Sequence, residues 1–563
     1  MPMDTFEKIN LDSLLNNITN IDTLRISNIS LSVIVLDKIF KVIKPGKLKE
    51  ISFVNCNVDK YVGKDLLENK LFDAHNLEIL NLSHNKIEHS ASLVFKNLIG
   101  KVNFRVLNLS NNFLTNAQDV DKYFRKFIEE TPSIEYLNFT FTNLHNNLST
   151  EDIESIGSLK KLRGISFESS TCKMNEIQIK AIARAIIASK NNESPLDFMN
   201  LRGCFNTYPD YEEFFGVLSE ISSCKEAENL DGFELIDDPM GNDPFALIKY
   251  LDISSGNFSS GFEQNKLKKG EFPGLKYIFT LVESLNMDSC QLTEKDARMI
   301  KYCLKQAGGK ATIKALTLSN NNFGAKGSEA LSALDISELD LSNCKVGVGG
   351  AHSFSKGISK NIFLKKLNLY SNGLRVEGAR LIAKGLEENK TLELLDVGSN
   401  LIRNKGFQAL KTCLNTSVKV LAAKNNSIKE AGFNHFMDAY HEVENTHLKT
   451  LLLASNDVSM YSIKLAEEDL NNQLYIDLTL KLENHNDRTL FLCGVNPKNT
   501  KPLLKKYFDK KGCGVIENID IIKGREKKKG KQNIFGFVKF AHKNAKKRVI
   551  QQLKEFEERP IKL

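Results

Sequence analysis

This chain of 563 residues has little of what a secreted, membrane-spanning or metal-dependent protein needs. No hydrophobic run reaches the length of a transmembrane helix, and the start at Met1-Pro-Met-Asp-Thr-Phe-Glu-Lys8 has neither a signal peptide nor a basic presequence. The ten cysteines form no C-x-x-C pair, which indicates reduced thiols. We therefore expect an intracellular protein, nuclear or cytoplasmic and not secreted, with no membrane partner.

Motifs of catalysis are also scarce. His435, His441 and His447 are spaced by six, which does not place them on one helical face as a metal site requires. Gly308-Gly-Lys310 is a poor phosphate loop, because Leu304 stands where its first glycine belongs and Ala311 replaces the hydroxyl that would hold magnesium. The sequence predicts no catalytic residue, no metal, no cofactor and no small-molecule substrate.

Most of the chain is a repeat. The template L-x-x-L-x-L-x-x-[NC]-x-L recurs between Leu48 and Val458, and most copies begin 26 to 31 residues apart. A strand and a turn need only about 20 residues, so the surplus predicts a helix in each copy, as at 377–386. The fourteen copies begin at Leu48, Leu77, Phe104, Ile134, Leu162, Leu196, Ile248, Val282, Ile313, Ile336, Leu364, Leu392, Val418 and Leu448.

This template resembles the leucine-rich repeat family, and its spacing resembles the ribonuclease-inhibitor-like subfamily. The resemblance implies an α/β solenoid shaped as a horseshoe, with parallel strands inside and helices outside. We assign residues 1–47 to an N-terminal cap, 48–458 to the solenoid and 459–487 to a connector or C-terminal cap. Two insertions, at about 205–247 and 259–277, interrupt the solenoid and are either binding loops or solvated loops.

Two positions of the repeat differ in expected role. The Asn or Cys near the end of each copy should satisfy buried backbone groups and is assigned no chemistry. The polar residue between the second and third leucines should face the concave side, as Asn81 and Asp396 do, and apolar Ala422 and Leu452 interrupt this polar series. That apolar patch predicts either a partner-binding surface or a face covered by a C-terminal cap.

The last seventy-odd residues have a different pattern. In Asn533-Ile-Phe-Gly-Phe-Val-Lys-Phe540, strand periodicity places Ile534, Gly536, Val538 and Phe540 on one face and Phe535, Phe537 and Lys539 on the other. In Thr489-Leu-Phe-Leu-Cys-Gly-Val495, Phe491 alternates with Leu490 and Leu492 in the same way. Aromatic rings beside cations on an outer face suit stacking of unpaired bases.

Residues 488–563, read as β-α-β-β-α-β, resemble the RNA recognition motif family, a small α+β fold of ferredoxin-like type. The resemblance places base stacking on Phe491, Phe535 and Phe537, and phosphate contacts on Lys539 and on the loop residues Arg525, Lys527, Lys528, Lys529 and Lys531. Asn533 and Ile534 depart from the basic residue and glycine of the family pattern, and Cys493 replaces a glycine. Such folds also bind proteins, so that reading stays open.

Charge is concentrated in the same segment. Residues 488–563 hold 21 Lys and Arg against seven Asp and Glu, a net charge of +14, while the whole chain is at +8. The remaining residues are therefore at −6. Such a charge attracts polyanions, whereas the mildly acidic remainder is unlike a nucleic-acid surface.

These patterns together predict a non-enzymatic adaptor that binds single-stranded RNA with its C-terminal domain and a protein partner with the concave face of its repeats. A purely protein-binding scaffold in a ribonucleoprotein or cytoskeletal assembly is the main alternative. A GTPase-activating protein of the same repeat subfamily is a third, and the basic C-terminal domain argues against it because that family has an acidic tail.

Overall fold

The structure of the protein is a computed structural model. It describes residues 21–58, 65–66, 73–87, 91–114, 119–189, 195–228, 246–258, 273–443, 445–458, 474–477, 489–492, 516–523 and 534–540. In 220–228, 273–274, 475, 477 and the three ranges beyond 488, only the backbone is described. The chain divides into two compact units, Met1–Leu478 and Thr479–Leu563.

The first unit is built on one sheet of sixteen strands, in which each strand pairs with the next along the chain. Every pair is parallel, and β2 to β15 are the strands of the fourteen predicted repeats. The strands are β1 (Thr23–Ser27), β2 (Glu50–Val54), β3 (Ile79–Asn81), β4 (Val106–Asn108), β5 (Tyr136–Asn138), β6 (Gly164–Ser166), β7 (Phe198–Asn200), β8 (Ile248–Asp252), β9 (Val282–Asn286), β10 (Ala315–Thr317), β11 (Glu338–Asp340), β12 (Lys366–Asn368), β13 (Leu394–Asp396), β14 (Val420–Ala422), β15 (Thr450–Leu452) and β16 (Tyr475–Asp477).

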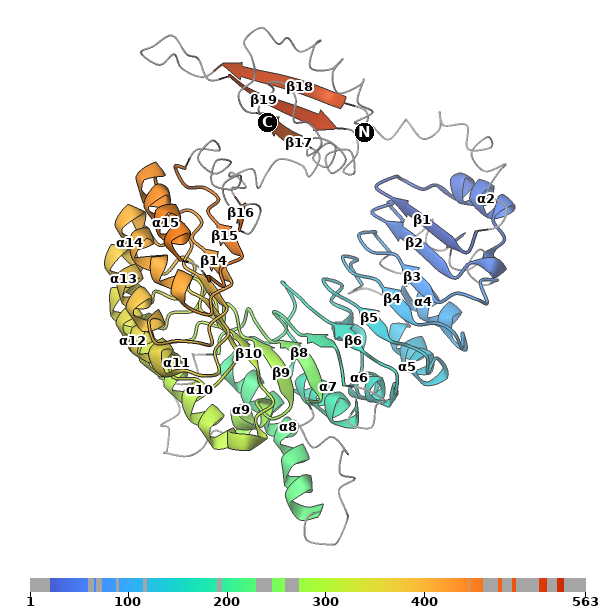
Figure 1. Cartoon of the computed structure of the whole chain (residues 1–563). Coiled ribbons are helices and arrows are strands. Elements are labelled where there is room, and N and C mark those ends of the chain that lie inside the picture. Colours follow the sequence, from blue (N-terminus) through green and yellow to red (C-terminus); the bar gives the residue numbers. More distant parts are fainter. Residues whose placement is uncertain are drawn as a thin grey trace. The chain divides into compact units, whose positions relative to one another are not determined.

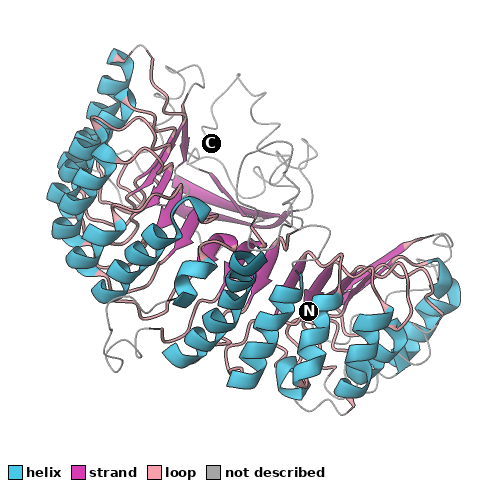
Figure 2. Cartoon of the chain, turned by 90° about the horizontal axis from the view of Figure 1, so that it is seen from below, coloured by secondary structure: helices cyan, strands magenta, loops and turns pink. Residues whose placement is uncertain are grey.

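Helices cover the outer side of this sheet, while the strands line the inner side of the arc (Figure 1 and Figure 2). Helices need more width than strands, so stacking of helix-containing repeats curves the sheet inward and leaves its inner face open. They are α2 (Val33–Val42), α4 (Ala91–Leu98), α5 (Val120–Glu130), α6 (Thr150–Ser155), α7 (Glu176–Ala188), α8 (Tyr208–Glu228), α9 (Pro273–Ile278), α10 (Glu294–Ala307), α11 (Gly324–Leu331), α12 (Gly347–Lys360), α13 (Arg375–Leu386), α14 (Arg403–Ala409) and α15 (Glu430–Glu442). The predicted horseshoe is confirmed.

The two insertions contain helices. α8 lies in the first insertion, at 205–247, and α9 lies at the end of the second, at 259–277. Residues 229–245 and 259–272 lie outside the described part of the chain. No helix among the described residues is long and apolar enough to cross a membrane.

The leucines of the template fill a continuous core. In the β3 repeat, Leu77, Leu80 and Leu82 are each fully buried, and the corresponding residues of the other repeats pack in line with them. Parallel register keeps this alignment, as in the pairing of Leu80 with Leu107. A core shared in this way means that each repeat depends on its neighbours for burial.

Buried asparagines connect consecutive repeats, as predicted. Oδ1 of Asn85 accepts hydrogen bonds from the backbone N–H groups of Cys56 and Val58 at 3.0 and 3.1 Å. Its Nδ2 donates to the carbonyls of Phe53 and Leu82 at 2.7 and 2.8 Å. One amide thus satisfies backbone groups of two repeats that the turn would otherwise leave without partners.

The second unit contains a three-stranded antiparallel sheet in the order β17-β19-β18 among its described residues. The strands are β17 (Thr489–Leu492), β18 (Ile516–Lys523) and β19 (Ile534–Phe540). The third strand of the predicted β-α-β-β-α-β order is thus central. Both predicted helices and the last strand lie outside the described residues.

Candidate nucleic-acid interface and concave surface

The three-stranded sheet gathers the predicted stacking residues on one face. Phe491 of β17 pairs directly with Phe537 of β19. Directly opposed residues of an antiparallel pair share a face, and so do residues two apart on one strand, so Phe535 and Lys539 belong to this face as well. Three phenylalanines and a lysine from two neighbouring strands therefore share one side of the sheet.

The opposite face is apolar throughout its central part. Leu490 pairs with Val538 and Leu492 with Gly536, while β18 adds Ile519 opposite Val538 and Ile521 opposite Gly536. Such a face needs a cover, and the sequence prediction assigns this role to two helices that lie outside the described residues. The face with the phenylalanines is then the one left for a ligand.

The third strand brings residues to the candidate interface that the sequence analysis did not single out. Asp520 pairs with Phe537, Asn518 with Lys539 and Ile522 with Phe535, so all three lie on the face of the phenylalanines. Their place follows from the register of β18, which has an irregularity between Ile516 and Asn518. Alternation along β19 alone could not identify them.

The proposed phosphate-binding residues are only partly located. Lys539 lies in β19, opposite Thr489. The loop residues Arg525, Lys527, Lys528, Lys529 and Lys531 lie outside the described residues. Their role in RNA binding stays a prediction.

The polar residues that end the strands of the first unit have a structural function. In nine strands the last residue is Asn or Asp, and its Oδ1 accepts a hydrogen bond of 2.7 to 3.0 Å from the backbone N–H two residues further on. This is an Asx turn, which ends the strand and turns the chain. We call these residues the strand-end column: Asn81, Asn108, Asn138, Asn200, Asp252, Asn286, Asp340, Asn368 and Asp396.

Ala422 and Leu452, the proposed partner-binding residues, occupy the same place in β14 and β15 without this hydrogen bond. Ala422 is buried, at 3% exposed, and Leu452 is partly buried. Strand β16 pairs with β15 and extends the sheet past Leu452. Ala422 therefore offers little surface to a partner, and partner binding at these two residues stays a prediction.

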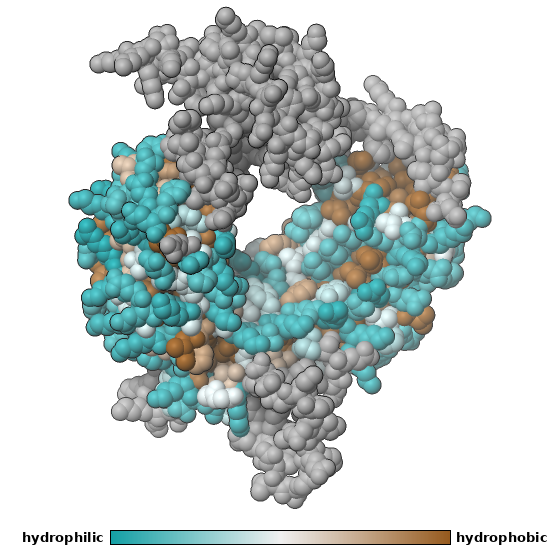
Figure 3. Space-filling view, viewed as in Figure 1, coloured by the Kyte–Doolittle hydropathy of each residue, from teal (hydrophilic) through white to brown (hydrophobic). Residues whose placement is uncertain are grey.

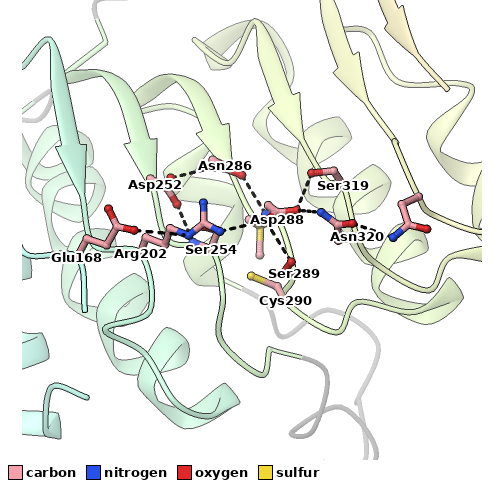
Figure 4. Close-up of polar contacts among 12 residues, drawn as sticks. Glu168, Arg202, Asp252, Ser254, Asn286, Asp288, Ser289, Cys290, Ser319 and Asn320 are labelled. Carbon is pink, nitrogen blue, oxygen red and sulfur yellow. Dashed lines mark hydrogen bonds and ion pairs between the residues drawn. The ribbon is translucent and has the colours of Figure 1, made fainter. Parts of the chain in front are cut away.

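A polar network lies on the concave side between β6 and β10 (Figure 4). Asp288 accepts hydrogen bonds from Ser319 and Asn320, both at 2.6 Å, and from Ser289 at 3.1 Å. The Arg202 guanidinium lies 3.7 Å from Asp288 and 3.8 Å from Glu168, at the outer limit of an ion pair. The repeat template does not identify Asp288, Glu168 and Arg202, although each lies two residues after a strand and so on its concave side.

Charges at the start of the strands are instead paired with one another. The residues that precede successive strands alternate in sign over much of the sheet, as Arg105, Glu135, Arg163 and Asp197 do. Arg105 binds Glu135 at 2.7 Å, and Arg163 and Lys249 each bind Asp197 at 2.8 Å. The hydrogen bond from Lys249 lowers the pKa of Asp197, so this carboxylate stays ionised and satisfied.

No group of three His, Cys, Asp or Glu side chains in the described ranges has a geometry that could hold a metal ion. Buried His145 has a pKa lowered to about 4 by burial, so it is neutral near pH 7. Its carbonyl accepts a hydrogen bond from Gln178 at 2.6 Å.

Comparison with known proteins agrees with this architecture. The family model for the RNA recognition motif matches residues 490–562, and leucine-rich repeat models match residues 76–98 and 360–383. No curated protein sequence matches the chain significantly. One matching solved chain, from the "Crystal structure of Rad7 and Elc1 complex in yeast", has 11% sequence identity and a TM-score of 0.30, with 76% of this chain and 92% of that chain covered.

The TM-score of that match is too low to show a shared fold, so the assignment depends on the family models and on the two sheets. The repeat models fall on the strands β3 and β12 and their turns. The RNA recognition motif model covers β18, β19 and all of β17 but its first residue, which are the strands of the second unit among the described residues. This chain is a leucine-rich repeat protein with a C-terminal RNA recognition motif.

Proposed function

We propose that the protein is a non-enzymatic RNA-binding adaptor: its second unit binds single-stranded RNA, and its repeat solenoid binds a protein partner. The observation that carries this proposal is the pairing of Phe491 with Phe537 on the face that also holds Phe535 and Lys539. Aromatic side chains arranged in this way are platforms for unpaired bases, and each stacked base contributes about 1–3 kcal/mol.

The charge distribution supports the division of roles. Residues 488–563 have a net charge of +14, and the rest of the chain has −6. RNA should therefore bind the second unit and be repelled by the first. A protein partner for the solenoid fits its open concave surface, which is the usual binding surface of this architecture. An intracellular location, nuclear or cytoplasmic, follows from such a function.

Binding of a random single-stranded RNA pool to the full chain tests the RNA-binding role. We expect binding that weakens as salt rises, with a log–log slope of about −3 if about five cations contact phosphates. The double variant Phe535→Ala, Phe537→Ala should weaken binding by at least about thirtyfold, because two stacking platforms are lost.

The double variant Phe113→Ala, Phe363→Ala is a matched control. Both residues are exposed aromatics of the solenoid, 67% and 49% exposed, and their loss should leave RNA binding unchanged. Equal weakening by both double variants, or no binding of wild-type protein at low salt, would contradict the proposal.

A protein-binding scaffold is the second candidate function. Asn533 and Ile534 stand where the family pattern has a basic residue and glycine, and β18 places acidic Asp520 opposite Phe537. A carboxylate on this face repels phosphate but accepts hydrogen bonds from a protein. If the wild-type protein does not bind RNA, the face of β19 becomes the first place to search for a protein contact.

A further inference from the structure

The concave face between β6 and β13 holds more acidic than basic residues, and it also carries aromatic rings. We consider the last three residues of each strand from β6 to β13. The first and third of these residues, together with the residue two positions after the strand, form what we call the central concave face. It holds six acidic residues and two basic ones, and one of the basic residues, Lys366, already pairs with Glu338 at 2.6 Å. The acidic residues are Glu168, Asp252, Asp288, Glu338, Asp340 and Asp396.

Two glycines on this face allow aromatic rings to lie flat on the sheet. A Cβ at Gly164 would overlap the ring of Phe198, which stacks on Tyr136 with ring centroids 6.1 Å apart and planes 17° apart. A Cβ at Gly398 would lie 2.7 Å from the ring of Tyr370. Each glycine thus leaves room for the ring of a neighbouring repeat.

A carboxylate flanks the Tyr370 platform. The Cβ position of Gly398 is 3.0 Å from Oδ1 of Asp396, which places this carboxylate beside the Tyr370 ring, itself 37% exposed. At the other platform, the Tyr136 hydroxyl donates to Asp197 at 3.2 Å, but this carboxylate already pairs with Arg163 and Lys249. Aromatic faces with carboxylates beside them attract organic cations by cation–π and ion-pair contacts, and arginine is the side chain that uses both best.

Some groups on or just below this face are incompletely satisfied among the described residues. The Ser254 hydroxyl has no hydrogen-bond partner among the described residues, and Ser254 is only 1% exposed. Burial raises the pKa of Asp396. The hydrogen bond from the Gly398 N–H and the positive charge of Lys424 oppose this rise only in part. The resident cation Arg202 is held loosely, at 3.7 and 3.8 Å from its two carboxylates.

We propose that the central concave face binds an extended arginine- and lysine-rich segment of a partner protein, one of whose cations lies on Tyr370 and whose cations pair with Asp340 and Asp396 in the negative field to which buried Asp252 contributes. This rests on the proposed function and specifies the chemistry of the solenoid's partner. Nucleic acid is repelled by this face. In Figure 3 hydrophobic residues form separate patches on a mostly hydrophilic surface, so charge rather than one large apolar area selects the partner.

The strand-end column offers substitutions that remove charge and keep the turn. Other repeats have Asn at this position, where Oδ1 makes the same bond to the backbone as in Asn108 and Asn138. The triple variant Asp252→Asn, Asp340→Asn, Asp396→Asn should therefore fold. The matched control, Glu329→Gln, Glu387→Gln, Glu388→Gln, removes three exposed carboxylates from the helical side.

The test measures binding of a fluorescent oligoarginine peptide to the full chain, with an oligoglutamine peptide of the same length as reference. We expect the concave triple variant to weaken oligoarginine binding about tenfold or more, and the helical-side variant to change it less than about twofold. Tyr370→Leu keeps an apolar side chain over Gly398 and should weaken binding about twofold to fivefold.

Equal weakening by both triple variants, or no preference for oligoarginine over oligoglutamine, would overturn the proposal. If the concave triple variant unfolds, Tyr370→Leu decides: unchanged binding rejects the site. RNA binding measured on the same wild-type preparation separates the two proposals, because its absence bears on the β19 face and leaves the peptide result standing.

Discussion

At the scale of single residues, the buried asparagines are the most connected side chains of the solenoid. Asn400 is fully buried. Its Oδ1 accepts from the N–H groups of Asn372 and Leu374 at 2.8 and 3.2 Å. Its Nδ2 donates to the carbonyls of Leu369, Val397 and Gly398 at 2.8 to 3.0 Å. The Asn400 side chain thus links the β12 repeat to the β13 repeat, to which Asn400 belongs.

Asn400→Ala should lower the free energy of unfolding by about 3 kcal/mol, because it leaves buried backbone groups of two repeats without partners. Urea unfolding followed by circular dichroism measures this. Exposed Asn415 is the control, and Asn415→Ala should change stability by less than about 0.5 kcal/mol. Similar losses of stability for both variants would show that the hydrogen bonds of Asn400 contribute no more than an exposed side chain does.

At the scale of elements, a side chain of helix α8 takes over the role of an Asn or Cys that is missing from the β8 repeat. In the β8 repeat the Asn or Cys position is Gly256, and the hydroxyl of Tyr211 from α8 donates to the carbonyl of Ile253 at 3.0 Å. This carbonyl corresponds to that of Leu82, to which Asn85 donates. A Cβ at Gly256 would overlap the Tyr211 hydroxyl, so the glycine and the tyrosine depend on each other.

Tyr211→Phe should lower the free energy of unfolding by about 1 kcal/mol, since the Ile253 carbonyl keeps only its weak contact with the Cys290 thiol at 3.6 Å. Gly256→Ala should cost more, because its methyl group displaces the buried ring. Thermal unfolding compares both with Tyr302→Phe, which changes a tyrosine that is 47% exposed on α10. A Tyr211→Phe variant as stable as the Tyr302→Phe variant would reject this role.

The same element shows what sequence patterns could and could not predict. The leucine template predicted β2 to β15 because burial on a shared core repeats with a fixed period. It could not connect Gly256 with Tyr211, because the hydrogen bond from Tyr211 to Ile253, 42 positions further along the chain, leaves no periodic trace. For the second unit, alternation placed Phe535 and Phe537 on one face, but only strand pairing brought Asp520 to that face.

At the scale of the whole molecule, the core contains thiols that burial keeps protonated. None of the described cysteines forms a disulfide. Burial raises the pKa of Cys290 to about 11 and those of Cys204, Cys303, Cys344 and Cys413 to about 12. In the unfolded chain a thiol ionises near pH 8.5, at about its ordinary pKa. Unfolding therefore releases protons at alkaline pH.

The solenoid should consequently lose stability as pH rises above about 8.5. Between the unfolded and folded pKa values the folded state binds more protons, so each thiol lowers the free energy of unfolding by up to about 1.4 kcal/mol per pH unit. The urea midpoint, measured from neutral pH to about pH 10, should be constant at first and then fall.

Substitution of single cysteines assigns the effect to the buried thiols. Cys413→Ala removes one fully buried titrating group and should reduce the slope of stability against pH above about 8.5, although it lowers stability at every pH through the lost packing. Cys172→Ser, which changes a partly exposed cysteine, is the comparison variant. A midpoint that stays constant through the alkaline range, or equal slopes in the two variants, would mean that these thiols are not the groups that couple folding to pH.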